Sequence, residues 1–92
     1  MYIQKGMVIT WDERKRAANI KKHGLDFADL TLEFFEGSVV YPAKEGRSLA
    51  VGRIGDAYFA AVVFSPLGNE GLSVISMRPA SKKEREHAGK NA

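Results

Sequence analysis

The sequence predicts an α+β fold with two N-terminal helices, an antiparallel β-sheet of about four strands and a C-terminal helix. The chain has 92 residues, of which 45% are hydrophobic and 27% are charged, a balance that suits one hydrophobic core. The spacing of its apolar residues changes near Ser38 from a helical period to the alternation typical of strands. We therefore expect residues 1–92 to form a single domain in which the helices precede the sheet.

The first part of the chain contains the signals for a short strand and a helix. Met7–Thr10 can form the strand, and Thr10 or Asp12 can cap a helix that runs to about His23. Gly24 follows as the left-handed residue that commonly ends a helix. The apolar residues of this helix form no clean stripe, so we expect its basic side chains to stay largely in water.

A second helix is predicted between Asp26 and Gly37. Asp26 and Asp29 resemble a capping box, and Gly37 can end the helix. The apolar residues cover a broad arc, formed by Phe27, Ala28, Leu30, Leu32, Phe34 and Phe35. The acidic residues fall on the remaining narrow face, formed by Asp29, Glu33 and Glu36. We interpret this acidic face as solvent-exposed or as a contact for a basic partner.

Four later segments have the alternation and β-branched content of strands: Val39–Tyr41, Arg47–Ile54, Ala57–Phe64 and Leu72–Arg78. Gly55-Asp56 predicts a two-residue hairpin, and the resulting register places Arg47 and Arg53 on one face of the sheet. The segment 65–71 reads as a longer loop, which leaves the face of Arg78 open by one residue. The nearly continuous apolar character of the third segment predicts a central strand with a helix on one face.

The end of the chain predicts a basic helix. Ser81 can cap it, and Glu84 occupies the position of a capping-box partner. The net charge of +3 is also concentrated here, because residues 1–70 are balanced and residues 71–92 carry the whole excess. A local excess of this kind suits a polyanionic partner, although most charged runs are simply solvated faces.

Composition excludes several classes of function. The chain contains no cysteine, which excludes disulfides, thiolate catalysis and cysteine–zinc sites. Its only histidines, His23 and His87, lie in different predicted elements, so we expect neither a metal site nor a cofactor. No segment reads as a membrane span or a signal peptide, which makes a cytoplasmic protein the expectation.

The basic residues of the strands and the last helix are the candidates for chemistry: Arg47, Arg53, Arg78, Lys82, Lys83 and Arg85. Arginine can hold a phosphate bidentately and stabilise the additional charge of a pentacoordinate transition state. A nearby carboxylate or lysine could accept the proton of a 2′-hydroxyl, which would give metal-independent RNA cleavage. The available proton-transfer groups are Lys44, Glu45, Lys83 and Glu84, and spacing alone selects none of them. A solvated sheet edge is the alternative interpretation.

Three motifs give the chain a resemblance to the BrnT family of toxins. They are W-D-E-x-K-x-x-x-N-x-x-K-H-G-L-x-F over Trp11–Phe27, R-x-x-A-V-G over Arg47–Gly52 and V-I-S-M-R-P-A-S-K-K-E-R over Val74–Arg85. The resemblance implies a RelE-like fold and an endoribonuclease activity that arrests translation. It also implies a cognate BrnA-type antitoxin, which neutralises the toxin by binding and carries the DNA-binding part through which the pair represses its own operon.

The resemblance also suggests roles for individual residues. Arg47 and Arg78 match family arginines and are expected at the scissile phosphate. The full set of catalytic candidates is Arg47, Arg78, Glu45 and Lys83, and the RNA-binding candidates are Lys44, Arg53, Lys82 and Arg85. Trp11, Asn19 and Gly24 match the opening motif, and we expect structural roles for them. The alternative function is a non-enzymatic RNA- or protein-binding module of a regulatory complex, with the acidic face of the second helix as one possible contact.

Overall fold

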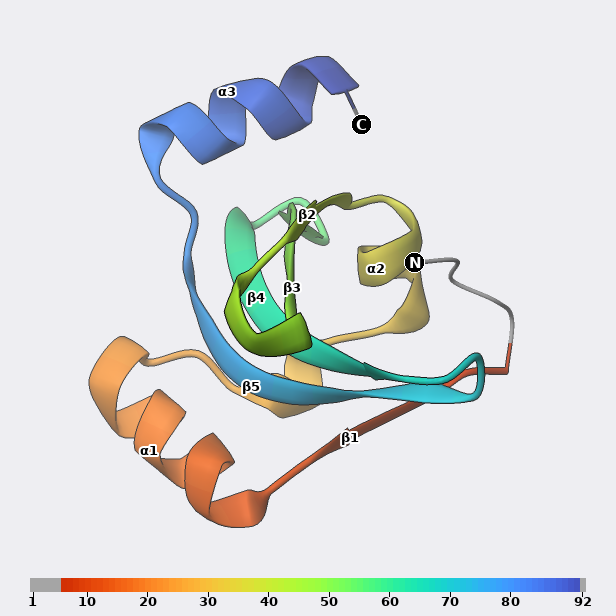
Figure 1. The fold of residues 1–92 in the computed structure, drawn as a ribbon. Coiled ribbons are helices and arrows are strands. Elements are labelled where there is room, and N and C mark those ends of the chain that lie inside the picture. The colour runs from red at the N-terminus through yellow and green to blue at the C-terminus, as the bar shows by residue number, and fades with distance from the viewer. Residues whose placement is uncertain (1–5, 92) are drawn as a thin grey trace.

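A five-stranded mixed sheet forms the centre of the computed structural model, which describes residues 6–91 (Figure 1). The strands are β1 (Val8–Trp11), β2 (Val39–Pro42), β3 (Ser48–Ile54), β4 (Tyr58–Leu67) and β5 (Gly71–Pro79). Their order across the sheet is β1-β5-β4-β3-β2. β1 runs parallel to β5, and the other neighbours are antiparallel.

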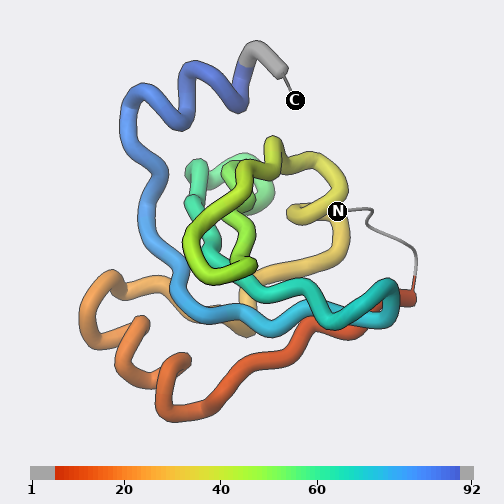
Figure 2. Tube along the Cα trace, viewed as in Figure 1, coloured from red at the N-terminus to blue at the C-terminus, as the bar shows by residue number. Residues whose placement is uncertain are grey.

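The α-helices are α1 (Glu13–His23), α2 (Leu32–Glu36) and α3 (Lys82–Asn91), and two short 3₁₀ helices, η1 (Phe27–Asp29) and η2 (Lys44–Gly46), complete the regular structure. In Figure 2, β5 can be followed along its whole length, from the hairpin beside β1 past α1 to the start of α3. Within the described residues, no helix is long and apolar enough to cross a membrane.

The α+β class is confirmed, but the prediction of an antiparallel sheet of about four strands is wrong. The short segment before α1 pairs in parallel with β5, from Val8 opposite Gly71 to Trp11 opposite Val74. It therefore becomes a fifth strand and makes the sheet mixed. Its partner lies more than sixty residues further along the chain, and a pairing at that separation leaves no local signal in the sequence.

The first predicted helix is confirmed together with both of its ends. The Asp12 carboxylate accepts hydrogen bonds from the backbone N–H groups of Arg14 and Lys15, as an N-cap does. Gly24 has φ = 71° and donates its N–H to the Ile20 carbonyl oxygen. An L-residue is strained in this left-handed region, so glycine is the favoured residue at this position.

The second predicted helix is wrong as a continuous element. The chain forms the single turn η1, becomes extended at Leu30 and starts again as the five-residue α2. Asp26 caps only the first turn, and the Thr31 hydroxyl accepts the Phe34 N–H at the start of α2. A local side-chain cap at Thr31 thus replaces the helical hydrogen bonds that would have joined the two pieces. Gly37 ends α2 as predicted.

Two strand connections also differ from the prediction. The β3–β4 loop has three residues, because Ile54 pairs with Tyr58, and this shifts the predicted register by one. β4 continues through Pro66 to Leu67, so the predicted long loop shrinks to residues 68–70. Proline is tolerated in β4 because the pairing with β3 ends at Phe64, which leaves that side of the strand without a hydrogen-bonding neighbour.

A β-bulge in β5 sends Arg78 away from the main core. Phe64 pairs with Val74 and Val63 pairs with Ser76, so Ile75 is an extra residue with no partner. The inserted residue reverses the alternation of side chains, because successive residues of a strand point to opposite faces. Met77 consequently packs in the main core, fully buried. Arg78 takes the opposite face, which decides the question that the sequence left open.

Helices and turns cover the two faces of the sheet separately. The main core lies between one face and the segments η1 and α2, and its aromatic residues are Phe27, Phe34, Phe35 and Phe64. The opposite face carries a smaller apolar cluster beneath α3, formed by Val51, Ala61, Ala80 and Ala88. The predicted helix packing on β4 is confirmed by the first of these layers.

Candidate functional site

Arg78 forms the best-defined polar contact on the α3 side of the sheet. Its Nη1 atom donates to Glu84 Oε1 at 2.7 Å and its Nη2 atom donates to Glu84 Oε2 at 3.0 Å. This two-point geometry fixes the plane of the guanidinium group. The Arg78 side chain is nevertheless 41% exposed, against 21% for Glu84. Arg78 is therefore held in place and remains accessible to a ligand.

Glu84 is held by the first turn of α3 as well as by Arg78. The Ser81 N–H donates to Glu84 Oε1 at 2.8 Å, and the Glu84 N–H donates to the Ser81 hydroxyl at 3.2 Å. These reciprocal bonds confirm the predicted capping box. The Arg78 guanidinium lowers the pKa of Glu84 from its ordinary 4.5 to about 2. Glu84 is therefore ionised near neutral pH and is a poor base there.

A cleft of about 470 Å³ opens between α1 and β5, and Arg78 is one of its lining residues. We call it the α1–β5 cleft, and its lining residues are Lys15, Ala18, Asn19, Lys22, His23, Ile75, Ser76 and Arg78. Three of these residues carry a positive charge and none is an acid, so the cleft favours an anionic ligand. The bulge residue Ile75 and the adjacent Ser76 form the β5 side of the cleft.

Asn19 joins the two walls of this cleft. Its Oδ1 atom accepts a hydrogen bond from the Met77 N–H at 3.0 Å, and its Nδ2 atom donates to the Leu25 carbonyl oxygen at 2.9 Å. β1 pairs with β5 only as far as Val74, so the Met77 N–H would otherwise have no partner on that edge. The structural role predicted for Asn19 is confirmed, since its side chain is buried and both of its polar atoms are used.

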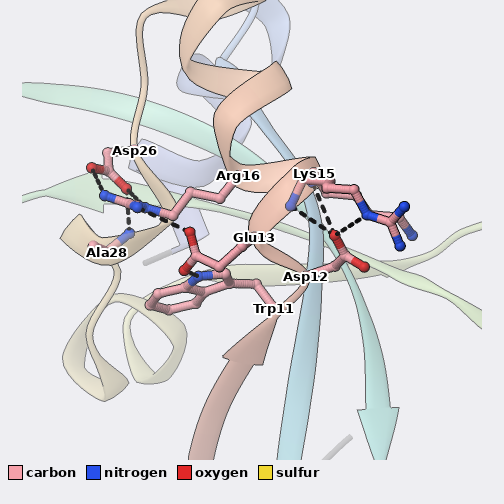
Figure 3. A network of polar contacts seen from close by, with 8 residues as sticks. Trp11, Asp12, Glu13, Lys15, Arg16, Asp26 and Ala28 are labelled. Atoms are coloured by element: carbon pink, nitrogen blue, oxygen red, sulfur yellow. Dashed lines mark hydrogen bonds and ion pairs between the residues drawn. The ribbon is translucent and has the colours of Figure 1, made fainter.

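A second polar network holds α1 near its N-terminal end (Figure 3). Arg16 donates two hydrogen bonds to Asp26, at 2.7 and 2.8 Å, and one to Glu13 at 3.2 Å. Trp11 donates from its indole nitrogen to Glu13 at 2.9 Å, and its ring packs edge-on against Phe27. The Arg16 guanidinium lowers the pKa of Asp26 from 3.8 to about 2. This network ties α1 to η1 and confirms a structural role for Trp11.

The predicted residues Lys44, Glu45 and Arg47 lie at the β2–β3 hairpin. Lys44 and Glu45 belong to η2, and Glu45 has φ = 61°, the one positive φ found at a non-glycine residue in the described part of the chain. The Arg47 Nη1 atom lies 3.9 Å from Glu45 Oε2, a looser contact than the one at Arg78. All three side chains are at least partly exposed to solvent.

The structure does not bring Arg47 and Arg53 beside Arg78. The strand register places Arg53 and Arg78 on the same face, but the apolar contact of α3 with Val51 and Ala61 lies between them. Arg47 precedes β3, at the opposite end of that strand from Arg53. Arg53 stacks over the Phe59 ring at 5.3 Å and lines a separate cleft that contains Asp29 and Glu33. Of the other predicted residues, Lys82, Lys83 and Arg85 lie in the first turns of α3, near Arg78 in sequence.

Sequence reasoning missed the contribution of α1 to this site. Lys15, Lys22 and His23 line the cleft, and the two lysines remain exposed to solvent, as expected for the basic residues of the first helix. The local signal was the charge balance of +3 over residues 11–23. In the part of the chain that the structure describes, no group of three or more His, Asp or Glu side chains is arranged to hold a metal ion.

Comparison with known proteins identifies the class to which this chain belongs, namely the ribonuclease toxins of type II toxin–antitoxin systems. Residues 11–84 match the sequence profile of a family described as "Ribonuclease toxin, BrnT, of type II toxin-antitoxin system". The chain belongs to the BrnT family, as its three motifs suggested. It is a ribonuclease toxin of a type II toxin–antitoxin system.

A solved structure supports the same assignment. The crystal structure of the Brucella abortus ribonuclease toxin BrnT is 55% identical to this chain, with a TM-score of 0.78. The match covers 83% of this chain and 99% of the Brucella chain. A search of curated proteins found no match.

Proposed function

We propose that this toxin cleaves RNA endonucleolytically and without a metal ion, by attack of a 2′-hydroxyl on the adjacent phosphate. In this reaction the 2′-oxygen loses its proton and bonds to phosphorus, while the bond from phosphorus to the 5′-oxygen breaks and that oxygen takes up a proton. The products are a 2′,3′-cyclic phosphate and a free 5′-hydroxyl. The reaction needs stabilisation of negative charge on the phosphoryl oxygens and two proton transfers.

The proposal rests mainly on the arrangement of Arg78. Its guanidinium is oriented by Glu84 and is still partly exposed in the lining of a cationic cleft. A fixed arginine can stabilise the charge that develops on a phosphorane, because no reorganisation is needed during the reaction. The further catalytic candidates are Arg47, Glu45 and Lys83. The candidates for contact with flanking phosphates are Lys44, Arg53, Lys82 and Arg85.

The proposal extends to the cellular role of the protein. Cleavage of RNA in the cytoplasm would arrest translation, and a BrnA-type antitoxin encoded beside the toxin would neutralise it by binding. Operator DNA would be contacted only through that antitoxin. The acidic side chains of η1 and α2 are exposed, which supports a contact with basic antitoxin residues there.

The direct test is cleavage of a defined single-stranded RNA by the purified toxin in the presence of excess EDTA. We expect products with 2′,3′-cyclic phosphate and 5′-hydroxyl ends, and no cleavage when every 2′-hydroxyl is methylated. The matched control is the same RNA with native 2′-hydroxyls in the same buffer. Products with 3′-hydroxyl ends, or cleavage that stops on addition of EDTA and returns with a divalent cation, would contradict the proposal.

A further inference from the structure

We propose that the α1–β5 cleft is a binding site for the phosphodiester backbone of RNA, in which Lys15 and Lys22 of α1 contact phosphates next to Arg78. The inference rests on the proposed ribonuclease function and extends it, because it assigns part of the substrate path to α1. The cleft contains three positively charged residues and no acidic one. A single-stranded polyanion is the ligand that this lining favours.

The spacing of the two lysines suits a nucleic acid strand. Lys15 and Lys22 are seven residues apart on α1, so they project from nearly the same face of the helix. Seven residues of α-helix span about 10.5 Å, which is about the length of three nucleotides in a stacked strand. Arg78 lines the same cleft from the β5 side. A strand in the cleft would therefore meet cations from both walls.

The acidic residues around α1 make their ion pairs and side-chain hydrogen bonds with groups other than the side chains of these lysines. Asp12 is used as the N-cap, and Glu13 and Asp26 both bind Arg16. Arg16 is thereby neutralised on the side of α1 that faces η1. Across the described residues, neither Lys15 nor Lys22 has a carboxylate within ion-pair distance. Arg16 therefore has a structural role in α1, whereas Lys15 and Lys22 form no ion pair within the described residues.

Two side-chain contacts hold α1 in place beside the cleft. Asn19 joins α1 to β5 through the Met77 N–H, and Arg16 joins the helix to Asp26. Ala18 is the small residue between the two lysines, and it leaves room for a sugar or phosphate at the centre of the cleft. Ser76 adds a hydroxyl on the opposite wall. Preorganised walls of this kind increase affinity by reducing the entropy lost on binding.

The test measures binding of a fluorescent, fully 2′-O-methylated single-stranded RNA by anisotropy over a range of salt concentrations. The Lys15→Gln/Lys22→Gln protein is compared with Arg14→Gln/Lys21→Gln, which removes the same charge from exposed positions of α1 outside the cleft. Each lost phosphate contact reduces the slope of log K against log salt by about 0.7 for a single strand. We expect a reduction of about 1.4 for the cleft variant and little change for the control.

Two readouts separate this inference from the proposed function. Cleavage of unmodified RNA by the wild-type toxin tests the function, and the salt slopes test the cleft. If the wild type cleaves RNA but the cleft variant and the control show equal slopes, the cleft proposal is overturned. Equal slopes together with weaker binding of the antitoxin to the cleft variant would also overturn it, and would assign the cleft to the protein partner. Circular dichroism checks that both variants are folded.

Discussion

Asn19 accepts a hydrogen bond at 3.0 Å from the backbone N–H of Met77, the residue that precedes Arg78 in β5. This bond joins two residues that are 58 positions apart and fixes the distance between α1 and β5. It continues the edge pairing of β5 where β1 ends, so a side chain replaces a strand. The geometry of the α1–β5 cleft therefore depends on one buried amide.

Replacement of this amide should destabilise the fold. Asn19→Ala leaves the Met77 N–H and the Leu25 carbonyl without their partners, and we expect a loss of about 2–4 kcal/mol in the free energy of unfolding. Asn19→Asp keeps the acceptor for Met77 but places a buried carboxylate against the Leu25 carbonyl oxygen, so it should lose at least as much. Urea denaturation measures both variants. A loss below about 0.5 kcal/mol for Asn19→Ala would show that water or a local rearrangement satisfies these groups.

The β-bulge predicts the outcomes of deletion and of substitution at Ile75. Deletion of Ile75 removes the extra residue and still leaves Met77 facing the main core and Arg78 facing away from it, so we expect the deletion variant to unfold cooperatively. Ile75→Ala removes the same side chain but keeps the bulge, and should cost about 1–2 kcal/mol at this half-buried position. Thermal unfolding followed by circular dichroism compares the two. A deletion variant without a cooperative unfolding transition would contradict this account of the bulge.

The Arg78–Glu84 pair should contribute modestly to stability. Glu84→Gln removes the charge and keeps an oxygen for the Ser81 N–H, and we expect a loss of about 1 kcal/mol or less, because Arg78 is partly exposed and solvent screens the pair. Glu86→Gln is the matched control, since it removes the same charge from an exposed position of α3. Chemical denaturation at low and high salt measures both. Equal losses for the two variants would show that the pair contributes nothing.

Two carboxylates should make the free energy of unfolding fall as the pH is lowered into the acidic range. The pKa values of Asp26 and Glu84 are lowered from 3.8 and 4.5 to about 2 by their arginine partners. The unfolded chain therefore binds protons before the folded protein does as the pH falls. Their stabilisation is present above about pH 4.5 and is lost between about pH 4.5 and 2. Asp26→Asn/Glu84→Gln should flatten the curve in this interval. A variant curve parallel to that of the wild type would contradict the assignment.

The sequence predicted those parts of the fold that depend on neighbouring residues. The cap of the first helix, the Gly24 terminator and the Ser81–Glu84 capping box are all made within a few positions of the chain. The last two are confirmed, and Asp12 is the cap of the two candidates Thr10 and Asp12. The split of the second helix was missed, because the Thr31 cap competes locally with a helical pattern that is equally strong. A helix cap can therefore be predicted from neighbouring residues, whereas the sequence does not show which of two possible caps starts a helix.

The parts that the sequence could not predict depend on distant residues. The parallel pairing of β1, the three-residue loop before Tyr58 and the bulge at Ile75 are set by cross-strand packing. The same limit applies to the candidate site. Arg78 was identified as a candidate, but its face depended on the bulge, and the contribution of Lys15 and Lys22 depended on how α1 docks against β5.

The central claim is that Arg78 acts on the scissile phosphate, and its most direct test is the single-turnover cleavage rate of a defined RNA by Arg78→Ala and by Glu84→Gln. Both substitutions break the same ion pair, but only the first removes the proposed charge. We predict a loss of about 100-fold or more for Arg78→Ala, as for other groups that stabilise transition-state charge, and less than about tenfold for Glu84→Gln. Equal losses in two folded variants would contradict the claim and would make Arg78 a structural residue.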